Sequence, residues 1–240
     1  MINSFSFNDL LYNGYFFLYN TYKIISDRQE RQIIEKYVKP GDIVLDIGAN
    51  IGSYCVYLST LVGESGHVYA FEPSPRNFSR LTKIVNSIKN VTIQQSAVGN
   101  FTGKSKLFLS NLVNTDHQLY QTNEKRTCVE VDCIRLDDYF NKDQRVDFIK
   151  MDIQGFEYHA FLGMYEVLKC NQDIKFIFEF WPLGLRDAGI APLDVIKWLR
   201  DQGFYLYVIE KDKLADFSED RVQYGALKYF NILGCREALV

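Results

Sequence analysis

The sequence predicts an α/β protein with a doubly wound, mostly parallel sheet of seven strands that closes with an antiparallel hairpin. Two observations support this fold class. Apolar strand-like runs alternate with segments of helical spacing from residue 43 onward, which is typical of parallel strands joined by helices on both faces. The last two strand-like runs, 204–210 and 226–234, have only a charged loop between them, and a short connection without a helix joins antiparallel strands.

The first half of the alternation follows a helix and a chain break. "DRQERQIIEKYV" (27–38) has apolar residues at helical spacing, and "KPGD" (39–42) interrupts the chain before the first strand. Ser74-Pro75 is a typical helix start because proline fits the first helical position. The strands expected here are 43–48, 67–73 and 91–99, and the helices are 53–62 and 74–88.

The second half begins with a predicted hairpin. "KSKLFLS" (104–110) and "CVEVDCI" (128–134) have the pattern of hairpin strands, with the polar loop 111–127 between them. Long loops in compact domains often serve as lids or binding loops, so we expect this loop to lie over an acceptor site. The remaining strands are 146–153, 174–180, 204–210 and 226–234, and the helices are 156–169 and 191–203.

Composition indicates one folded domain. The chain has 240 residues, of which 47% are hydrophobic, enough for a sizeable core. The net charge of -3 and the absence of a clustered basic run argue against a nucleic-acid partner. The five cysteines are odd in number and form no C-x-x-C pair, so we interpret them as reduced thiols and predict a cytoplasmic location.

The N-terminal segment is distinctive. Residues 10–25 are apolar and aromatic, without a basic leader or a small-residue cleavage site, so they make a poor signal peptide. Polar residues interrupt the segment, which is also too short to span a bilayer. We expect it to pack as a helix or helical hairpin on the domain or on a second copy of the chain. The predicted division is an N-terminal extension, 1–37, followed by the main domain, 38–240.

"DIGANIG" (46–52) has the pattern of a cofactor loop at the end of the first strand. Gly52 is followed by Ser53 without a lysine, which excludes a P-loop, and the glycine spacing does not fit G-x-G-x-x-G. Asp46 would repel a pyrophosphate held at this turn but would attract a cation. S-adenosyl-L-methionine carries an ammonium group, a sulfonium and no phosphate, and it fits this pattern.

Two further strand ends add to this cofactor site. Glu72 ends the second strand, where a carboxylate can accept hydrogen bonds from both ribose hydroxyls, and Pro73 turns the chain beside it. The third strand ends in "SAVG" (96–99), whose backbone can meet the adenine edge. The predicted cofactor-binding residues are Asp46, Gly48, Ala49, Asn50, Gly52, Tyr54, Glu72, Pro73, Ser96, Ala97 and Val98.

Five segments together resemble the FkbM family of S-adenosylmethionine-dependent methyltransferases: "DIGANIGSY", "FEPSPRNF", "SAVGN", "IRLDDYF" and "DFIKMDIQGFE". The resemblance covers residues 38–210 and implies a class I methyltransferase, a Rossmann-like fold. It also implies O-methylation of small molecules and glycans, including sugar hydroxyls. One departure stands out, because Gln154 occupies the third position of the family's usual Asp-x-Glu-Gly. Glu157, in the same first helical turn, could supply the missing carboxylate.

Ligands of doubly wound sheets bind at the carboxyl ends of the strands, and three candidate catalytic residues lie there. Asp152 ends the fourth strand and is the first candidate for a general base or substrate-orienting residue. Glu179, at the end of the fifth strand, is the second candidate, and Lys150 lies on the same strand face as Asp152. His117 and Trp181 are the candidates for acceptor binding. We find no metal-ligand spacing, although Asp152 and Glu179 alone could share a magnesium ion.

The leading interpretation is an enzyme that methylates a sugar or glycan hydroxyl. Another small-molecule hydroxyl, such as that of a polyketide or lipid headgroup, is the alternative acceptor. A non-catalytic binding protein stays open because of Gln154, and a nicotinamide-dependent oxidoreductase is disfavoured by Asp46 and the glycine spacing. Expected partners are a small-molecule or glycan acceptor and a second copy of the chain bound through the N-terminal aromatic segment, with no stable membrane insertion.

Overall fold

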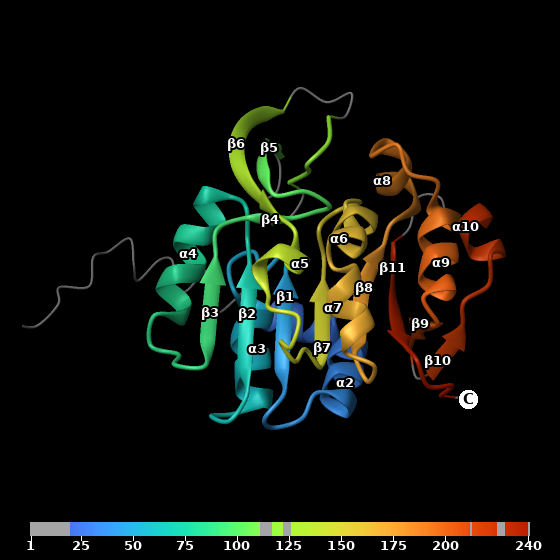
Figure 1. Cartoon of the computed structure of the whole chain (residues 1–240), viewed down its shortest axis with the longest axis horizontal. Helices are drawn as coiled ribbons and strands as arrows, with labels where there is room; N and C mark the ends of the chain where they lie inside the picture. Colours follow the sequence, from blue (N-terminus) through green and yellow to red (C-terminus); the bar gives the residue numbers. More distant parts are fainter. Residues whose placement is uncertain (1–19, 111–116, 122–125, 212, 225–228, 240) are drawn as a thin grey trace, which may run out of the picture.

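The computed structural model describes residues 20–110, 117–121, 126–211, 213–224 and 229–239. Its main sheet has eight strands in the order β10-β9-β11-β8-β7-β1-β2-β3 (Figure 1). These strands are β1 (Ile43–Ile47), β2 (His67–Phe71), β3 (Val91–Gln94), β7 (Phe148–Met151), β8 (Lys175–Phe180), β9 (Tyr205–Glu210), β10 (Lys213–Asp216) and β11 (Phe230–Cys235).

The predicted fold class is confirmed, with one more strand than expected. Strands β3, β2, β1, β7 and β8 pair in parallel, and β11 is antiparallel to both β8 and β9. The segment 211–221, predicted as a charged loop, contains β10, which pairs antiparallel with β9 at the sheet edge. Charged residues are typical of edge strands because one side of such a strand faces solvent. The charged residues of β10 therefore led to the prediction of a loop where the structure has an edge strand.

A second, three-stranded sheet has the order β4-β6-β5 and lies beyond the carboxyl ends of the main strands (Figure 1). Its antiparallel pair, β5 (Gly103–Leu109) and β6 (Thr127–Ile134), confirms the predicted hairpin strands. The predicted strand 91–99 proves to be two strands in different sheets, because β4 (Ala97–Val98) leaves the main sheet and pairs in parallel with β6. Ser96 lies at this break.

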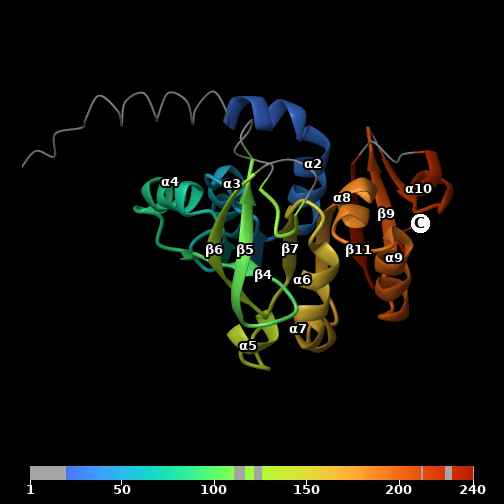
Figure 2. The same cartoon turned by 90° about the horizontal axis from the view of Figure 1, so that it is seen from above.

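Helices cover both faces of the main sheet. Figure 2 shows α2, α3 and α4 on one face, and α5, α6, α7 and α9 on the other. The predicted helix 156–169 is interrupted at Met164, whose backbone departs from helical geometry. From residue 28 onward, the helices of the described residues are α2 (Arg28–Tyr37), α3 (Ser53–Val62), α4 (Pro75–Val85), α5 (Leu136–Tyr139), α6 (Glu157–Gly163), α7 (Tyr165–Cys170), α8 (Pro182–Asp187), α9 (Pro192–Asp201) and α10 (Asp220–Tyr224).

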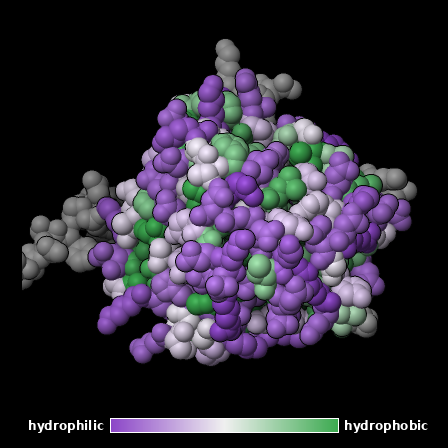
Figure 3. Space-filling view, viewed as in Figure 1, coloured by the Kyte–Doolittle hydropathy of each residue, from purple (hydrophilic) through white to green (hydrophobic). Residues whose placement is uncertain are grey.

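The core consists of two apolar layers, one on each face of the sheet. Neighbouring strand residues point to opposite faces, so Val44 and Phe148 enter one layer whereas Leu45 and Ile149 enter the other. All four side chains are buried. This double burial explains the nearly continuous apolar runs of the central strands. The face viewed in Figure 3 is mostly hydrophilic, with hydrophobic residues in scattered patches.

The N-terminal extension is described only in part, because residues 1–19 lie outside the described residues. Residues 20–26 are helical, and α2 follows them with Ile34 completely buried against the domain. The boundary at residue 37 and the pairing of two copies stay predictions. In the described part of the chain, no helix has the length and apolar character needed to cross a membrane. The five cysteines are all unpaired.

Candidate functional site

A cavity of about 1120 Å³ lies where β1, β2, β7 and β8 end. Strand β1 pairs with β2 on one side and with β7 on the other, so the chain changes direction across the sheet here. Ligands of doubly wound sheets bind at such a switch point. Typical ligand pockets measure roughly 300–1,000 Å³, so this cavity has room for a cofactor together with an acceptor.

The turn between β1 and α3 forms one wall. Gly48 has φ +85°, and a Cβ atom there would overlap the backbone carbonyl of Asp152. The backbone N–H groups of Gly48 and Ala49 both donate to the carbonyl of Phe71, at 2.9 and 3.0 Å. Asn50 also has a positive φ, +52°. The glycine therefore lets the turn pass close to the end of β7, and it leaves bare backbone along the cavity.

Glu72 lies beside this turn with its carboxylate held by backbone donors. Its Oε2 accepts from the N–H of Asn50 at 2.8 Å, and its Oε1 accepts from the N–H of Ser74 at 2.9 Å. Burial raises the pKa of Glu72 to about 7, against the lowering effect of these donors. Glu72 and Pro73 both line the cavity. A carboxylate has about four acceptor positions on its two oxygens, which suits a vicinal diol such as that of a ribose.

The break between β3 and β4 forms the next part of the wall. Ser96, Ala97 and Val98 line the cavity, together with the apolar side chain of Leu107. The hydroxyl of Ser96 is buried, and it has no hydrogen-bond partner among the described residues. A buried polar atom without a partner is unfavourable, so this hydroxyl suits a ligand with its own polar edge, such as adenine.

Two predicted cofactor residues, Asp46 and Gly52, are absent from the described lining of the cavity. Asp46 is completely buried opposite Lys150 in the β1–β7 register, and burial raises its pKa to about 7. Gly52 precedes α3 with φ +97°, and a Cβ atom there would press on Leu81. The structure thus places Gly52 behind the wall, where it shapes the turn, and Asp46 behind the wall in β1. Contact of either residue with the cofactor stays a prediction.

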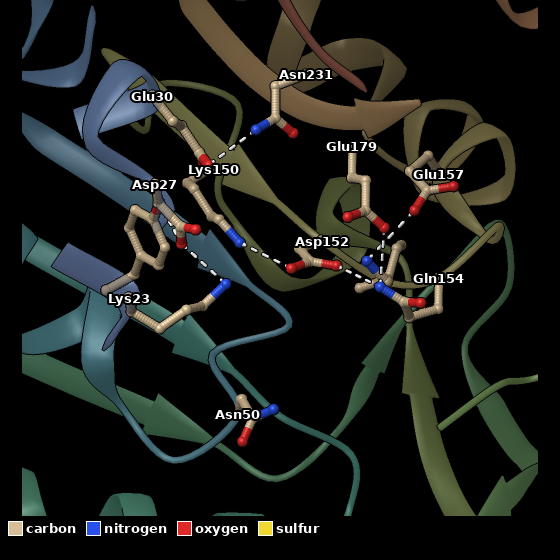
Figure 4. Close-up of polar contacts among 12 residues, drawn as sticks. Lys23, Asp27, Glu30, Asn50, Lys150, Asp152, Gln154, Glu157, Glu179 and Asn231 are labelled. Atoms are coloured by element: carbon tan, nitrogen blue, oxygen red, sulfur yellow. Dashed lines mark hydrogen bonds and ion pairs between the residues drawn. The ribbon is translucent and has the colours of Figure 1, made fainter. Parts of the chain in front are cut away.

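Four polar side chains form a hydrogen-bonded network along the floor of the cavity (Figure 4). They are Lys150, Asp152, Gln154 and Glu179. Lys150 Nζ lies 3.4 Å from Oδ2 of Asp152. The side-chain nitrogen of Gln154 donates to Oδ1 of Asp152 at 2.8 Å and to Oε2 of Glu179 at 2.9 Å. The three predicted catalytic residues therefore meet in one place, and the residue that joins them is the one that departs from the family pattern.

The pKa values of the two carboxyl groups on the cavity floor, Asp152 and Glu179, are shifted in opposite directions. Burial favours the neutral form of Asp152, but Lys150 and Lys23 outweigh it and lower the pKa of this carboxyl. Burial, followed by repulsion from Asp152 and Glu157, raises the pKa of Glu179 well above its usual range. The pKa of Lys150 is raised despite burial, because the surrounding carboxylates favour its cation. The surroundings therefore favour the anion of Asp152 and the protonated form of Glu179.

Glu157 does not replace the missing family carboxylate. Its Oε1 accepts from the backbone N–H groups of Ile153 at 3.3 Å and Gly155 at 3.1 Å. Glu157 is buried beneath the turn that leads into α6, so it holds this turn and leaves the cavity floor to Asp152, Gln154 and Glu179. Among the described residues, no group of three or more His, Cys, Asp or Glu side chains is arranged for a metal ion.

The N-terminal helix contributes a wall that the sequence did not predict. Tyr22 and Lys23 line the cavity, and Lys23 pairs with Asp27 at 2.8 Å. Tyr54, which was predicted, lines it too and donates its hydroxyl to Asp27 at 3.1 Å. The nitrogen of Lys150 lies 4.6 Å from the centre of the Tyr54 ring. No sequence signal connects Lys23 with these residues, because their contact depends on how the helix packs.

The predicted acceptor residues His117 and Trp181 both line the cavity. His117 accepts from the backbone N–H of Ser110 through Nδ1 at 3.1 Å, and the Trp181 ring packs so closely on Gly184 that a Cβ would overlap it. Of the predicted lid 111–127, segments 111–116 and 122–125 lie outside the described residues. Lining residues that sequence reasoning missed include Gln118, Leu119, Gln121, Arg126, Ile153, Gln154, Arg186 and Tyr229.

The chain resembles known methyltransferases in sequence. Residues 46–206 match the family model "Methyltransferase FkbM domain". The "Hexuronic acid methyltransferase AglP" of Haloferax volcanii is 24% identical over 185 residues, which cover 76% of this chain and 71% of that protein. The "2-O-methyltransferase NoeI" of Sinorhizobium fredii is 26% identical over 155 residues, which cover 58% of this chain and 63% of that protein.

Two solved structures have a similar fold. An rRNA methylase from Streptococcus thermophilus has a TM-score of 0.51 at 11% identity, covering 87% of this chain and 95% of its own. A protein from Streptococcus mutans, assigned as a methyltransferase and solved with SAH, has a TM-score of 0.51 at 12% identity. That match covers 85% of this chain and 94% of the other. At this identity the likeness establishes the fold.

Proposed function

The chain belongs to the FkbM family of methyltransferases, and on that premise we propose that it methylates a hydroxyl group of a sugar or glycan. The protein is an S-adenosyl-L-methionine-dependent methyltransferase with a class I fold. The sugar acceptor is supported by the two relatives, whose names state a hexuronic acid and a 2-O position. One observation carries the proposal: a single cavity holds the carboxylate of Glu72 and, across the glycine turn, the Asp152–Glu179 pair.

The residues of the cavity wall fit the cofactor. Glu72 would accept hydrogen bonds from the ribose hydroxyls, since both of its oxygens are already oriented by backbone donors. The unpartnered Ser96 hydroxyl and the apolar side chains beside it would receive the adenine. Gly48 and Ala49 would let the amino-acid end pass close to the backbone. When bound, S-adenosyl-L-methionine supplies a methyl group whose bond to sulfur breaks with the electrons left on sulfur.

The remaining residues would hold the acceptor and take its proton. A sugar hydroxyl is a weak nucleophile at neutral pH, so a nearby carboxylate that receives its proton can raise the rate by about 10²–10⁴-fold. Asp152 and Glu179, which both line the cavity, are our candidates for this base, and Lys150 favours the anion of Asp152. The flat face of Trp181 suits the apolar face of a sugar ring. Fixed alignment of the acceptor oxygen can contribute a further 7–11 kcal/mol, approximately.

A methyl-transfer assay tests the proposal. The purified protein is incubated with S-adenosyl-L-methionine and a panel of neutral nucleotide sugars, uronic-acid nucleotide sugars and free glycans. Product masses are then measured, and the methylated position is assigned by NMR. We expect transfer to at least one sugar hydroxyl. Transfer only to non-sugar alcohols, with every sugar left unmodified, would overturn the sugar proposal while keeping the methyltransferase.

A further inference from the structure

Gln154 contacts both candidate bases through one nitrogen atom. A primary amide has two N–H bonds, and here each serves one carboxylate: one donates to Asp152 at 2.8 Å and the other to Glu179 at 2.9 Å. Two carboxylates at this separation repel each other in a buried site. The Gln154 amide offsets this repulsion by placing a donor between the two groups (Figure 4).

The backbone around Gln154 is built to aim this side chain. Gln154 has φ +54°, in the left-handed region that costs energy for residues other than glycine. Its carbonyl accepts from the hydroxyl of Tyr120 at 2.8 Å. The next residue, Gly155, has φ +94°, and a Cβ there would overlap the backbone of Gly184. Tertiary contacts on both sides therefore maintain a strained conformation that directs the amide to the carboxylates.

The contacts also separate the roles of the two acids. Both oxygens of Asp152 have donors, one from Lys150 and one from Gln154. Glu179 has a donor only on Oε2, and its Oε1 has no hydrogen-bond partner among the residues described. Glu179 lines the cavity. Its Oε1 is thus the oxygen available for an acceptor hydroxyl, whereas Asp152 is engaged on both sides.

We infer that Gln154 is a positioning residue whose amide holds the Asp152–Glu179 pair so that Oε1 of Glu179 receives the proton of the acceptor hydroxyl. The inference rests on the proposed function. As the proton moves to Oε1, the electron pair left on the acceptor oxygen forms the bond to the methyl carbon. Asp152 then anchors the Gln154 amide. Glu179 becomes the first candidate for the general base, and Asp152, which the sequence ranked first, becomes the second.

The surroundings of Glu179 determine the pH dependence. Burial and the neighbouring carboxylates raise its pKa, which favours its protonated form before ligands bind. An amide donor stabilises its anion, so loss of this donor raises the pKa further. Activity that needs the anion then begins at higher pH. The charged and titratable groups that face Glu179 from the surrounding elements are Asp152, Glu157, Lys150, Lys23 and Tyr229.

Two substitutions distinguish the effect of the Gln154 amide donor from the effect of its strained backbone. Gln154→Glu keeps the shape and replaces the donor by a third carboxylate. Gln154→Gly removes the side chain and relieves the positive φ, so this variant keeps the fold if Gln154→Glu does not. Gln172→Glu is the matched control, because it adds the same charge on an exposed residue before the amino end of β8. For each protein, kcat is measured against pH, and calorimetry gives Kd for S-adenosyl-L-homocysteine.

We expect the acidic limb of the kcat profile to move up by about one pH unit in both Gln154 variants, which lowers kcat at pH 7 about tenfold. The Kd for S-adenosyl-L-homocysteine should change less than about twofold, and the control should follow the wild type. An unchanged pH profile, or a loss that appears only in KM, would overturn the inference.

A measurement without an acceptor separates this inference from the proposed function. Carboxyl carbon NMR of protein labelled at glutamate follows the titration of Glu179, whose signal is identified by its loss in Glu179→Gln. We expect a higher pKa of Glu179 in both Gln154 variants than in the wild type. An equal pKa would overturn the role of Gln154 even if sugars are methylated, whereas failure to methylate any sugar would count against the proposed acceptor only.

Discussion

Glu179→Gln should lower the activity of the enzyme and raise the stability of its fold. Glutamine keeps the volume of the side chain, and its carbonyl oxygen can still accept from Gln154, which lies 2.9 Å from Oε2 in the wild type. The variant loses the capacity to receive a proton. We therefore expect kcat to fall at least about 100-fold, the lower end for a lost general base, which corresponds to about 2.7 kcal/mol in activation free energy.

The stability change follows from the pKa of Glu179. Burial and neighbouring carboxylates raise this pKa in the folded state. The stability linked to this group is therefore complete below its unfolded pKa of about 4.3, and it is lost as pH rises toward the folded pKa. At pH 7 the wild type has lost much of this contribution. Because glutamine does not ionise, we expect the variant to be more stable by about 1 kcal/mol or more, a rise in Tm of roughly 2–4 °C.

Three measurements on Glu179→Gln test the expected loss of kcat and the expected gain in stability. These are kcat with a sugar acceptor, Kd for S-adenosyl-L-homocysteine and Tm at pH 7 and pH 4. Glu64→Gln, on an exposed residue that follows α3, is the control for a lost negative charge. The stabilisation should shrink at pH 4, where the wild-type carboxyl is largely protonated in both states. Near-normal kcat would refute the role of Glu179 as the base, and a lowered Tm at pH 7 would refute the electrostatic reasoning.

Three other changes test the rest of the site. Glu72→Ala should weaken binding of S-adenosyl-L-homocysteine by about 1.5–3 kcal/mol, the range for hydrogen bonds to a charged group; an unchanged Kd in calorimetry would show that another residue binds the ribose. Asp152→Asn should reduce kcat by less than Glu179→Gln does, because Asp152 anchors the pair and does not receive the proton, and it should lower Tm, because buried Lys150 loses its closest carboxylate. A normal Tm would contradict that pairing. Gly48→Ala should lower Tm and weaken cofactor binding together, since its Cβ would overlap Asp152; wild-type values for both would contradict the close approach.

Much of the fold and half of the site followed from the sequence alone. Alternating strands and helices predicted the parallel sheet, and the short closing connection predicted that β11 is antiparallel to β9. Strand ends located the cavity residues, because parallel strands bring their carboxyl ends to one edge. Gly48, Glu72 and Ser96 were found in this way, on three separate elements. These features are visible in sequence because periodicity and turn residues are local properties of the chain.

Other features required the tertiary structure. A single predicted strand became β3 and β4 because Ala97 and Val98 pair with β6, a partner far along the chain. Lys23 enters the cavity only through the packing of the N-terminal helix. Asp46 has the sequence pattern of a contact residue, yet it lies behind the wall, because strand register places it opposite Lys150 and buries it.

Gln154 shows most clearly why sequence was insufficient. In the sequence it is a departure from a family pattern and suggests a lost function. In the structure its left-handed backbone, maintained by Tyr120 and by the close approach of Gly155 to Gly184, directs the amide between two acids. The residue type determines that two N–H donors are present. Where they point depends on contacts between segments distant in the chain, because packing alone selects a strained backbone conformation over the relaxed ones.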